Sequence, residues 1–595
     1  MITKSLLCFY VFLMCFLIAN ALPLEISAQQ TSQIRNLNKN EDYETIQQAI
    51  NAASVGDVIY VGNGLYNEHV IVNKTLSLIG ENRFNTIIDG GDSGNVLFIT
   101  ADNVTVTGFT LQNSGLVLTV GGVYINRSVH NKIIGNVIKN NKYGIYLFYS
   151  SGNSIMNNTV INNSYGIELV SSADNIVSSN NFMCNNRGIW LSISVNNVFC
   201  GNNISSNHFE GVLLSASANN AFSNNRVKNN TNGFHAISST YNDIFDNDVS
   251  MNEQAFFLSA SRSNTFSRNN VSINNYGVVL GASCDNLFSS NHMINNRNSF
   301  RIVTSLNNII FHNNFINTIA DTTQKPYIIE SANSWDNGVE GNYWSRFNET
   351  DENEDGIIDM PYVIDERNMD NCSLKAPYTL FHVVTDTMSY IVDVICNSTI
   401  SEFKYLSHED NRTDSLSFEV GGDTGNIFLR ICIPHSLIAP PYTVIANHVT
   451  LLHSRIVHSN GTHSWIYFTC YCSKYRPTVI SLSSLKQPFW YQLWFWTLIG
   501  LAVIVIILFF FVIKYRKTLK QQKKLIEAYE LELQRKADNH VEAVQASFKT
   551  DVTRRELKIK LFEKKYNLKI QPHDSFEEII KTAKFKKDRE KKKSS

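Results

Sequence analysis

The feature that most constrains this chain is an internal repeat that runs from Gly122 to Asn317. Nine units follow one another with a spacing of 22 residues, apart from one spacing of 23. Most units open on glycine followed by three residues typical of β-strands, as in Gly144-Ile-Tyr-Leu and Gly188-Ile-Trp-Leu. A fixed period in this range indicates a solenoid, in which each unit buries its apolar side chains against the next unit.

Apolar residues recur at four fixed positions of each unit. Two of them lie one and three residues after the opening position, which is the alternation of a strand with one buried face. The other two lie eleven and sixteen residues after it, so each unit supplies three short strands. The sequence therefore predicts an all-β fold: a right-handed parallel β-helix with three-strand coils of about 22 residues. The first of these inward positions holds Val123, Ile145, Ile167, Ile189, Val212, Phe234, Phe256, Val278 and Phe300.

Two columns of asparagine lie between the predicted strands, and both run through all nine units. Asn tolerates the left-handed backbone of a corner, and stacked carboxamides can hydrogen-bond from one coil to the next. We interpret both columns as structural ladders, with a row of Asn-lined ligand sites as the alternative. The columns are Asn131, Asn153, Asn175, Asn197, Asn220, Asn242, Asn264, Asn286 and Asn308, and Asn136, Asn158, Asn180, Asn202, Asn225, Asn247, Asn269, Asn291 and Asn313.

Both ends of the chain carry membrane signals. Residues 1–21 combine a basic residue, an apolar run and a small-residue cleavage site, which is typical of a signal peptide. Residues 490–513 are apolar, begin with several tryptophans, and are long enough to form one transmembrane helix. The basic stretch that follows predicts that residues 514–595 are a helical or disordered cytoplasmic tail. We therefore expect a single-pass membrane protein with extracellular N-terminal domains.

Three further parts lie between these segments. Residues 43–345 predict the β-helix, and an amphipathic helix at residues 43–53 would close its N-terminal end. Residues 346–370 form an acidic junction, and short alternating runs in residues 378–480 predict a small membrane-proximal β-sandwich. The net charge of -1 gives no reason to expect a nucleic-acid partner. Disulfide pairing can occur among Cys372, Cys396, Cys432, Cys470 and Cys472, with the connectivity open.

Short motifs at the two ends of the repeat resemble a known family. Thr45-Ile-Gln-Gln-Ala-Ile50, Gly56-Asp-Val-Ile-Tyr-Val61 and Leu76-Ser-Leu-Ile-Gly80 are similar to the cap and first coils of pectin-lyase-like β-helix proteins. Together with the Asn-rich coils and Gly341-Asn-Tyr-Trp-Ser345, they look most like the NosD-type β-helix family, which includes many archaeal surface proteins. The resemblance covers residues 43–366. It implies a β-helix, and the family's association with the copper centre of nitrous oxide reductase implies a role in copper maturation.

Copper would need thiolate or imidazole ligands. Candidate ligands gather in the predicted sandwich, outside the part of the chain that resembles the family. Ordinary disulfides and surface histidines explain this set without a metal, so we do not expect copper. The candidates are Cys432, His435, His448, His453, His458, His463, Cys470 and Cys472.

The acidic junction matches the first part of a calcium-binding loop. Asp351, Asn353, Asp355 and Asp359 place side-chain oxygens at loop positions 1, 3, 5 and 9, and Ile357 offers its carbonyl at position 7. A glycine at position 6 allows the sharp turn, but position 12 is tyrosine instead of the bidentate glutamate. The sequence therefore predicts a structural calcium ion that braces the junction. An acidic surface turn is the alternative.

The position two residues after each opening glycine points away from the predicted core, and several units place an aromatic ring there that can stack on a sugar. Glu168 is the single carboxylate of this column, whereas glycosidic hydrolysis generally needs two. We therefore predict non-catalytic binding of an extracellular glycan or another surface partner. A polysaccharide lyase or glycoside hydrolase, and a NosD-like copper-maturation factor, are the alternatives. The predicted binding residues are Tyr124, Tyr146, Glu168, Trp190 and His235.

Overall fold

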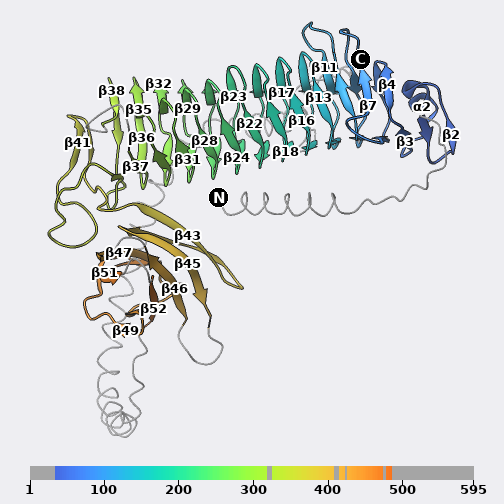
Figure 1. The fold of residues 1–595 in the computed structure, drawn as a ribbon. Coiled ribbons are helices and arrows are strands. Elements are labelled where there is room, and N and C mark those ends of the chain that lie inside the picture. The colour runs from blue at the N-terminus through green and yellow to red at the C-terminus, as the bar shows by residue number, and fades with distance from the viewer. Residues whose placement is uncertain (1–33, 318–324, 408–413, 422–424, 473–476, 485–595) are drawn as a thin grey trace, which may run out of the picture. The chain divides into compact units, whose positions relative to one another are not determined.

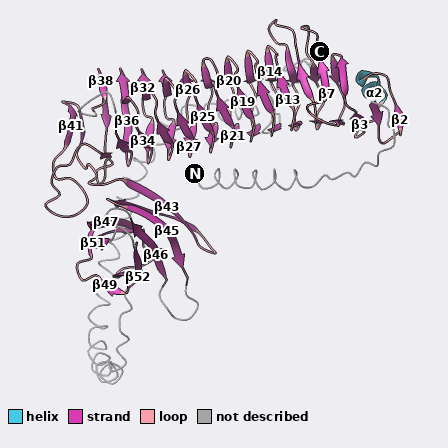
Figure 2. Cartoon of the chain, in the orientation of Figure 1, coloured by secondary structure: helices cyan, strands magenta, loops and turns pink. Residues whose placement is uncertain are grey.

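The computed structural model describes residues 34–317, 325–407, 414–421, 425–472 and 477–484, and all of them belong to one compact unit. The predicted signal peptide (1–21), membrane helix (490–513) and tail (514–595) lie outside the described residues. Within those ranges, no helix has both the length and the apolar character needed to cross a membrane. Figure 1 follows the chain from end to end, and Figure 2 separates strands from loops.

Most of the described chain is a right-handed parallel β-helix, as the sequence predicts (Figure 1). Three long sheets, named A, B and C here, run along it, and each regular coil gives one strand to each sheet. Neighbouring coils pair in register, so that Ile145 pairs with Ile167 and Ile167 with Ile189. These side chains are fully buried. The predicted inward columns are therefore confirmed, and they form a continuous core.

The strands of the three sheets follow in sheet order. Sheet A contains β2 (Glu41–Asp42), β1 (Ile34–Asn36), β3 (Val58–Val61), β6 (Ser77–Gly80), β9 (Thr105–Thr107), β12 (Lys132–Ile134), β15 (Ser154–Met156), β18 (Ile176–Ser178), β21 (Val198–Cys200), β24 (Ala221–Ser223), β27 (Asp243–Phe245), β30 (Thr265–Ser267), β33 (Leu287–Ser289), β36 (Leu306–Phe311) and β39 (Ala332–Ser334). Sheet B contains β4 (Gly64–Asn67), β7 (Thr86–Asp89), β10 (Thr110–Gln112), β13 (Val137–Lys139), β16 (Thr159–Ile161), β19 (Asn181–Met183), β22 (Asn203–Ser205), β25 (Arg226–Lys228), β28 (Asp248–Ser250), β31 (Asn270–Ser272), β34 (His292–Ile294), β37 (Asn314–Ile316) and β40 (Tyr343–Trp344). Sheet C contains β5 (Val70–Val72), β8 (Leu97–Ile99), β11 (Gly121–Asn126), β14 (Tyr143–Phe148), β17 (Tyr165–Val170), β20 (Arg187–Ser192), β23 (Glu210–Ser215), β26 (Asn232–Ile237), β29 (Gln254–Ser259), β32 (Tyr276–Gly281), β35 (Asn298–Val303) and β38 (Tyr327–Ile329).

The two predicted asparagine columns are hydrogen-bonded ladders inside the corners of the coils. Asn180 donates from its backbone N and from Nδ2 to Oδ1 of Asn202, at 2.9 and 3.1 Å. Its Nδ2 also reaches the carbonyl of Ile155, at 2.8 Å. Each carboxamide thereby satisfies backbone groups that the turn leaves unpaired inside the protein. The interpretation of these columns as structural ladders is confirmed.

Two more ladders occupy the third corner and the exit from sheet C, and the sequence analysis missed both. They work in the same way: Asn185 N donates to Asn207 Oδ1 at 3.1 Å, and Ser172 N donates to Ser194 Oγ at 3.1 Å. The missed columns are Asn141, Asn163, Asn185, Asn207, Asn230, Asn252, Asn274 and Asn296, and Ser128, Ser150, Ser172, Ser194, Ser217, Ser239, Ser261, Ser283 and Ser305. Both recur with the same period, so the repeat alone contained the signal.

A short helix, α2 (Ile46–Ala52), closes the N-terminal end, within the predicted range 43–53. It begins later than predicted because Thr45 is extended and caps it, accepting a hydrogen bond from the backbone N of Gln48 at 3.1 Å. Both carboxylate oxygens of Glu68 accept backbone N–H groups from the first turn. The apolar face of α2 covers the first coil.

The C-terminal end of the β-helix is closed by a hairpin of β41 (Tyr362–Asp365) and β42 (Asn368–Asp370). Asn368 and Asp370 continue the two predicted ladders: Asn333 N donates to Asn368 Oδ1 at 3.0 Å, and Asn342 N to Asp370 Oδ2 at 2.8 Å. An aspartate suits a final rung, because its carboxyl oxygens accept hydrogen bonds and it has no amide group that needs a further rung as acceptor. The predicted junction therefore contains the C-terminal cap.

The chain then forms two five-stranded antiparallel sheets that share one core, as the predicted sandwich requires. The first contains β43 (Tyr378–Val384), β44 (Ser389–Cys396), β47 (Gly425–Pro434), β51 (His463–Cys472) and β50 (Arg455–Ser459). The second contains β45 (Thr399–Leu406), β46 (Ser415–Gly421), β52 (Thr478–Ser484), β48 (Tyr442–Ala446) and β49 (Val449–Thr450). Arg430 of the sandwich forms a buried ion pair at 2.8 Å with Glu340, which lies between β39 and β40 of the last coil.

Candidate functional site

The predicted binding column lies on the outward face of sheet C. Strand register pairs Tyr124 with Tyr146, Tyr146 with Glu168 and Glu168 with Trp190, and His235 stands two strands beyond Trp190. These residues are aligned along the sheet as predicted, but their side chains are less exposed than those of an open row of aromatic rings would be. Tyr146 and Glu168 are only 6% and 5% exposed, whereas the other three side chains are half-buried.

A second column on the same face was missed by the sequence analysis. It consists of the residue before each opening glycine, and includes Tyr143, Tyr165 and Arg187, which pair in register. Strict alternation would turn this position inward. The glycine itself faces the interior, however: a side chain at Gly144 would meet Val160 at 2.6 Å. Because two consecutive residues point inward there, the residue before them returns to the outer face.

Aromatic rings from both columns pack into a continuous layer. The ring centroids of Tyr124 and Tyr146 are 5.0 Å apart, those of Tyr143 and Tyr165 are 4.8 Å apart, and those of Tyr165 and Trp190 are 5.5 Å apart. These distances are typical of favourable ring pairs. The layer is apolar and encloses the carboxyl group of Glu168 on β17.

Two carboxyl groups on this face have opposite electrostatic environments. Burial raises the pKa of Glu168 to about 7, although the Tyr143 hydroxyl and the charge of Arg187 favour its ionised form. Glu210 is also buried, but its neighbours hold its pKa below the usual value. Arg187 Nε lies 2.7 Å from Glu210 Oε2, and His235 Nδ1 lies 3.5 Å from Oε1. One arginine is thus committed to Glu210, and Glu168 has no ion-pair partner among the described residues.

Buried polar atoms without a hydrogen-bond partner concentrate on this face. Nine such side-chain atoms occur in the described part of the chain, and five of them belong to the two outward columns of sheet C. Buried polar groups are normally paired, so a cluster of unpaired ones marks a place where a ligand can supply the partners. From β17 to β29 the cluster spans four strand spacings, roughly 19 Å. The five atoms are Glu168 Oε2, Trp190 Nε1, Asn232 Oδ1, Gln254 Oε1 and His235 Nδ1, whose approach to Glu210 Oε1 at 3.5 Å does not have hydrogen-bond geometry.

The acidic loop predicted to bind calcium is closed by its own hydrogen bonds. Asp351 accepts the backbone N–H groups of Asp355 and Gly356 at 3.0 and 2.9 Å, and Asn353 Nδ2 donates to Asp359 Oδ1 at 3.3 Å. Burial raises the pKa of Asp351, and the neighbouring carboxylates act in the same direction.

Arg430 of the sandwich and Leu374, which precedes the sandwich, also hold this loop in place. Arg430 donates to the carbonyl of Asp355 at 2.7 Å, and Ile357 pairs with Leu374. No group of three or more His, Cys, Asp or Glu side chains in the described ranges is placed to hold a metal ion. Calcium binding stays a prediction of the sequence.

The candidate copper ligands of the sandwich do not form a metal site either. Cys372, Cys396, Cys432 and Cys470 are free thiols, so the pairing considered for them is not present. Burial raises the pKa of Cys470 to about 11 and that of Cys432 further, which disfavours the thiolate that a metal requires. His435 donates to or accepts from Ser464 Oγ at 2.8 Å instead. The residues present do not fit a copper centre.

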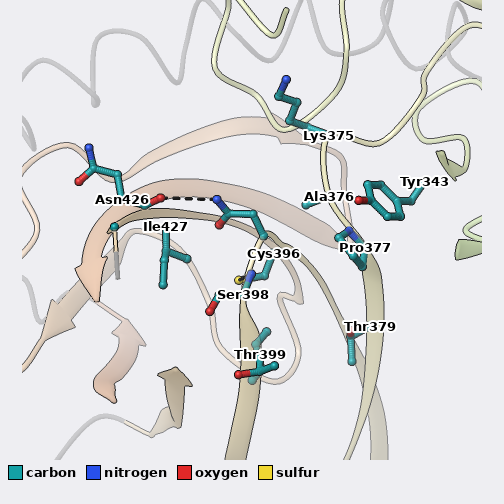
Figure 3. Close-up of a pocket in the computed structure, with 13 residues that line it drawn as sticks. Tyr343, Lys375, Ala376, Pro377, Thr379, Cys396, Ser398, Thr399, Asn426 and Ile427 are labelled. Atoms are coloured by element: carbon teal, nitrogen blue, oxygen red, sulfur yellow. Dashed lines mark hydrogen bonds between the residues drawn. The ribbon is translucent and has the colours of Figure 1, made fainter. Parts of the chain in front are cut away.

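A hollow of about 750 Å³ opens beside the start of the sandwich (Figure 3). Tyr343, Lys375, Pro377 and Thr379 line one part of it, and strand residues around Asn397 and Asn426 line the other. Asn397 Nδ2 donates to the carbonyl of Asn426 at 3.5 Å. The polar atoms that line this hollow have hydrogen-bond partners or face solvent. The hollow therefore lacks the unpaired buried groups found on sheet C.

These features define a parallel β-helix protein whose sheet C carries buried polar atoms without partners on its outward face. A sequence model of the family described as periplasmic copper-binding protein (NosD) matches residues 50–211 and 205–349, just over half of the chain. The chain therefore belongs to the NosD family, as the resemblance in its sequence implied.

Other likenesses are more limited. A cell surface glycoprotein of Methanothermus fervidus is 31% identical over 112 residues, which is 18% of this chain and 18% of the glycoprotein. The match thus spans about a fifth of that relative's length. Among solved structures, the Dettilon tailspike protein is 13% identical with a TM-score of 0.38, over 71% of this chain and 86% of its own. The catalytic domain of a GH87 α-1,3-glucanase is 12% identical with a TM-score of 0.41, over 54% and 71%.

Proposed function

We propose that this protein displays its β-helix outside the cell and binds a glycan along the outward face of sheet C, without cleaving it. The observation that carries the proposal is the set of five buried polar atoms without partners on that face. Trp190 Nε1 is a donor, and the amide oxygens of Asn232 and Gln254 are acceptors. A ligand rich in hydroxyl groups offers partners of both kinds at successive rungs.

The aromatic layer supports a sugar ligand over a protein loop. Tyr124 and Trp190 are half-buried, with part of each ring on the surface, and a pyranose ring can stack its apolar face on them. An aromatic ring and an unpaired polar atom occur together on β17, β20, β26 and β29. A linear glycan has a matching repeat of apolar faces and hydroxyl groups, which a protein surface does not have.

The proposed location rests on the predicted signal peptide (1–21) and membrane helix (490–513), together with the names of the relatives. One relative is a cell surface glycoprotein, and the family is described as periplasmic. We expect a single span, with residues 514–595 in the cytoplasm. Protease added to intact cells should remove the β-helix and leave the tail protected. Protection of the β-helix would contradict the orientation.

Binding is tested with the full-length protein on immobilised neutral, acidic and amino-sugar oligosaccharides. Trp190→Ala should lower the affinity for any retained glycan at least tenfold, because aromatic stacking contributes on the order of 1 kcal/mol and Nε1 loses its partner as well. Tyr241→Ala is the matched control, since this exposed ring lies on a corner away from sheet C. Equal losses in both variants, or no retention of any glycan, would overturn the proposal.

A second candidate function is glycan cleavage. One observation favours it: two carboxyl groups on one face have their pKa values displaced in opposite directions, which is how enzymes separate a general acid from a base. Glu168 would be the acid and Glu210 the base. Incubation of the protein with the retained glycan distinguishes the two functions. New reducing or unsaturated ends that vanish with Glu168→Gln would favour the enzyme, and an unchanged glycan favours binding.

A further inference from the structure

The surroundings of Glu168 indicate which class of glycan fits the outward face of sheet C, and this inference rests on the proposed function. We infer that the glycan carries a free amino group, and that its ammonium binds against Glu168 within the aromatic layer. The site would thus take an amino sugar in its unacetylated form. The proposal stands on three observations: an unpaired buried carboxyl oxygen, the rings around it, and the imbalance of charge on the face.

Glu168 is the position on this face that lacks a partner for a negative charge. Its side chain is 5% exposed, and its Oε2 is buried without a hydrogen-bond partner. The Tyr143 hydroxyl donates a hydrogen bond to the carboxyl group of Glu168, but this leaves Oε2 without a partner. A buried carboxylate is stabilised by a cation that also donates hydrogen bonds, and an ammonium group has three donors.

The two cations nearest to Glu168 on this face do not form an ion pair with it. Arg187 is held at 2.7 Å by Glu210, and its guanidinium also lies over the ring of Trp190, at 5.4 Å. Lys142 places its ammonium over the ring of Tyr165, at 5.3 Å, and forms no ion pair among the described residues. Two carboxyl groups therefore share one arginine, which leaves Glu168 available for an additional cation.

The rings that enclose Glu168 also favour a positive charge. Tyr143, Tyr146, Tyr165 and Trp190 contribute aromatic faces around it, and such faces attract cations, most strongly when water is excluded. Tyr165 and Trp190 are half-buried, so either ring can turn to admit the ligand. An N-acetylated sugar has a neutral acetamide in place of the ammonium group, and this acetamide is also bulkier.

The probes are a glucosamine tetrasaccharide and its fully N-acetylated counterpart, each titrated against the full-length protein. We expect the glucosamine form to bind at least tenfold more tightly at pH 7. Burial holds the pKa of Glu168 near 7, so the ionised fraction of this group rises about fivefold between pH 6 and pH 7. Affinity for the glucosamine form should rise over this range, by less than that factor because the amine itself begins to lose its proton, whereas affinity for the acetylated form should stay flat or fall.

Glu168→Gln should abolish both the preference for the amine and its pH dependence, while binding of the acetylated form remains. Glu253→Gln is the matched control, because it removes an exposed carboxylate elsewhere on the β-helix. As a second readout, bound glucosamine should remove the protonated carboxyl band of Glu168 from the infrared difference spectrum at pH 6.5.

Equal affinity for the two tetrasaccharides, or a preference that survives in Glu168→Gln, would overturn the inference. If the two sugars bound equally well and Trp190→Ala weakened the binding of both, the proposed glycan binding would stand and only the preference for an amino sugar would fall. Absence of binding to every sugar tested would overturn both.

Discussion

A single interior asparagine of the ladders should carry a large share of the local stability of the β-helix. Asn202 donates through Nδ2 to the carbonyl of Val177 at 2.9 Å, and its Oδ1 accepts the backbone N–H of Asn180 at 2.9 Å. Asn202→Ala leaves both of these buried backbone groups unpaired. Each such group costs about 1–3 kcal/mol, so the free energy of unfolding should fall by about 2–6 kcal/mol.

Two measurements test this expectation on the full-length protein. Urea unfolding gives the overall loss, and because long solenoids can unfold in parts, hydrogen exchange of a peptide covering residues 177–185 gives the local loss. Asn270→Ala is the matched control: this exposed asparagine lies in β31, and its removal should change stability by less than about 0.5 kcal/mol. If Asn202→Ala behaved like Asn270→Ala, the ladders would not be satisfying buried groups and the reasoning would be refuted.

The remaining predictions concern the C-terminal end of the β-helix and the acidic loop. Arg430→Met should lower the free energy of unfolding by about 3 kcal/mol, because it leaves the buried Glu340 with His312 as its one remaining ion-pair partner among the described residues. Arg455→Met at a half-exposed site should cost under about 1 kcal/mol, and equal effects in urea unfolding would contradict this. Burial raises the pKa of Asp370 to about 7, so the folded state holds a proton that the unfolded state releases near pH 4; stability should therefore fall as the pH rises from about 4 to 7, and Asp370→Asn should flatten that fall. Calcium added to the metal-free protein should raise the thermal unfolding midpoint, and Asp351→Ala should remove the rise; no rise in the original protein would leave the loop an acidic turn.

Much of the fold could be predicted because the repeat is one-dimensional. A unit that stacks on an identical neighbour must place the same kind of side chain inward at the same position, so Ile145, Ile167 and Ile189 identified the core before any contact was known. The asparagine ladders follow from the same argument. The cap helix was also predicted from sequence, although its first residue depended on the extended backbone at Thr45.

The candidate site was only half predicted. Periodicity identified the column of Tyr146, Glu168 and Trp190, but it could not place Arg187 and Glu210 beside them. Those residues face outward because the glycine after them points inward together with its successor, which breaks the alternation assumed for a regular strand. The second carboxylate was therefore invisible to a search of one column.

By itself, the sequence determined that this chain forms a parallel β-helix, where its coils begin, and which side chains fill its core, because these properties repeat with a fixed period. Only the tertiary structure decided which groups are left unpaired. The burial of Glu168, the commitment of Arg187 to Glu210, and the use of Asp370 as the last rung of a ladder depend on contacts between residues of different coils and caps. Such contacts have no period, since side-chain direction and local burial fix them one site at a time.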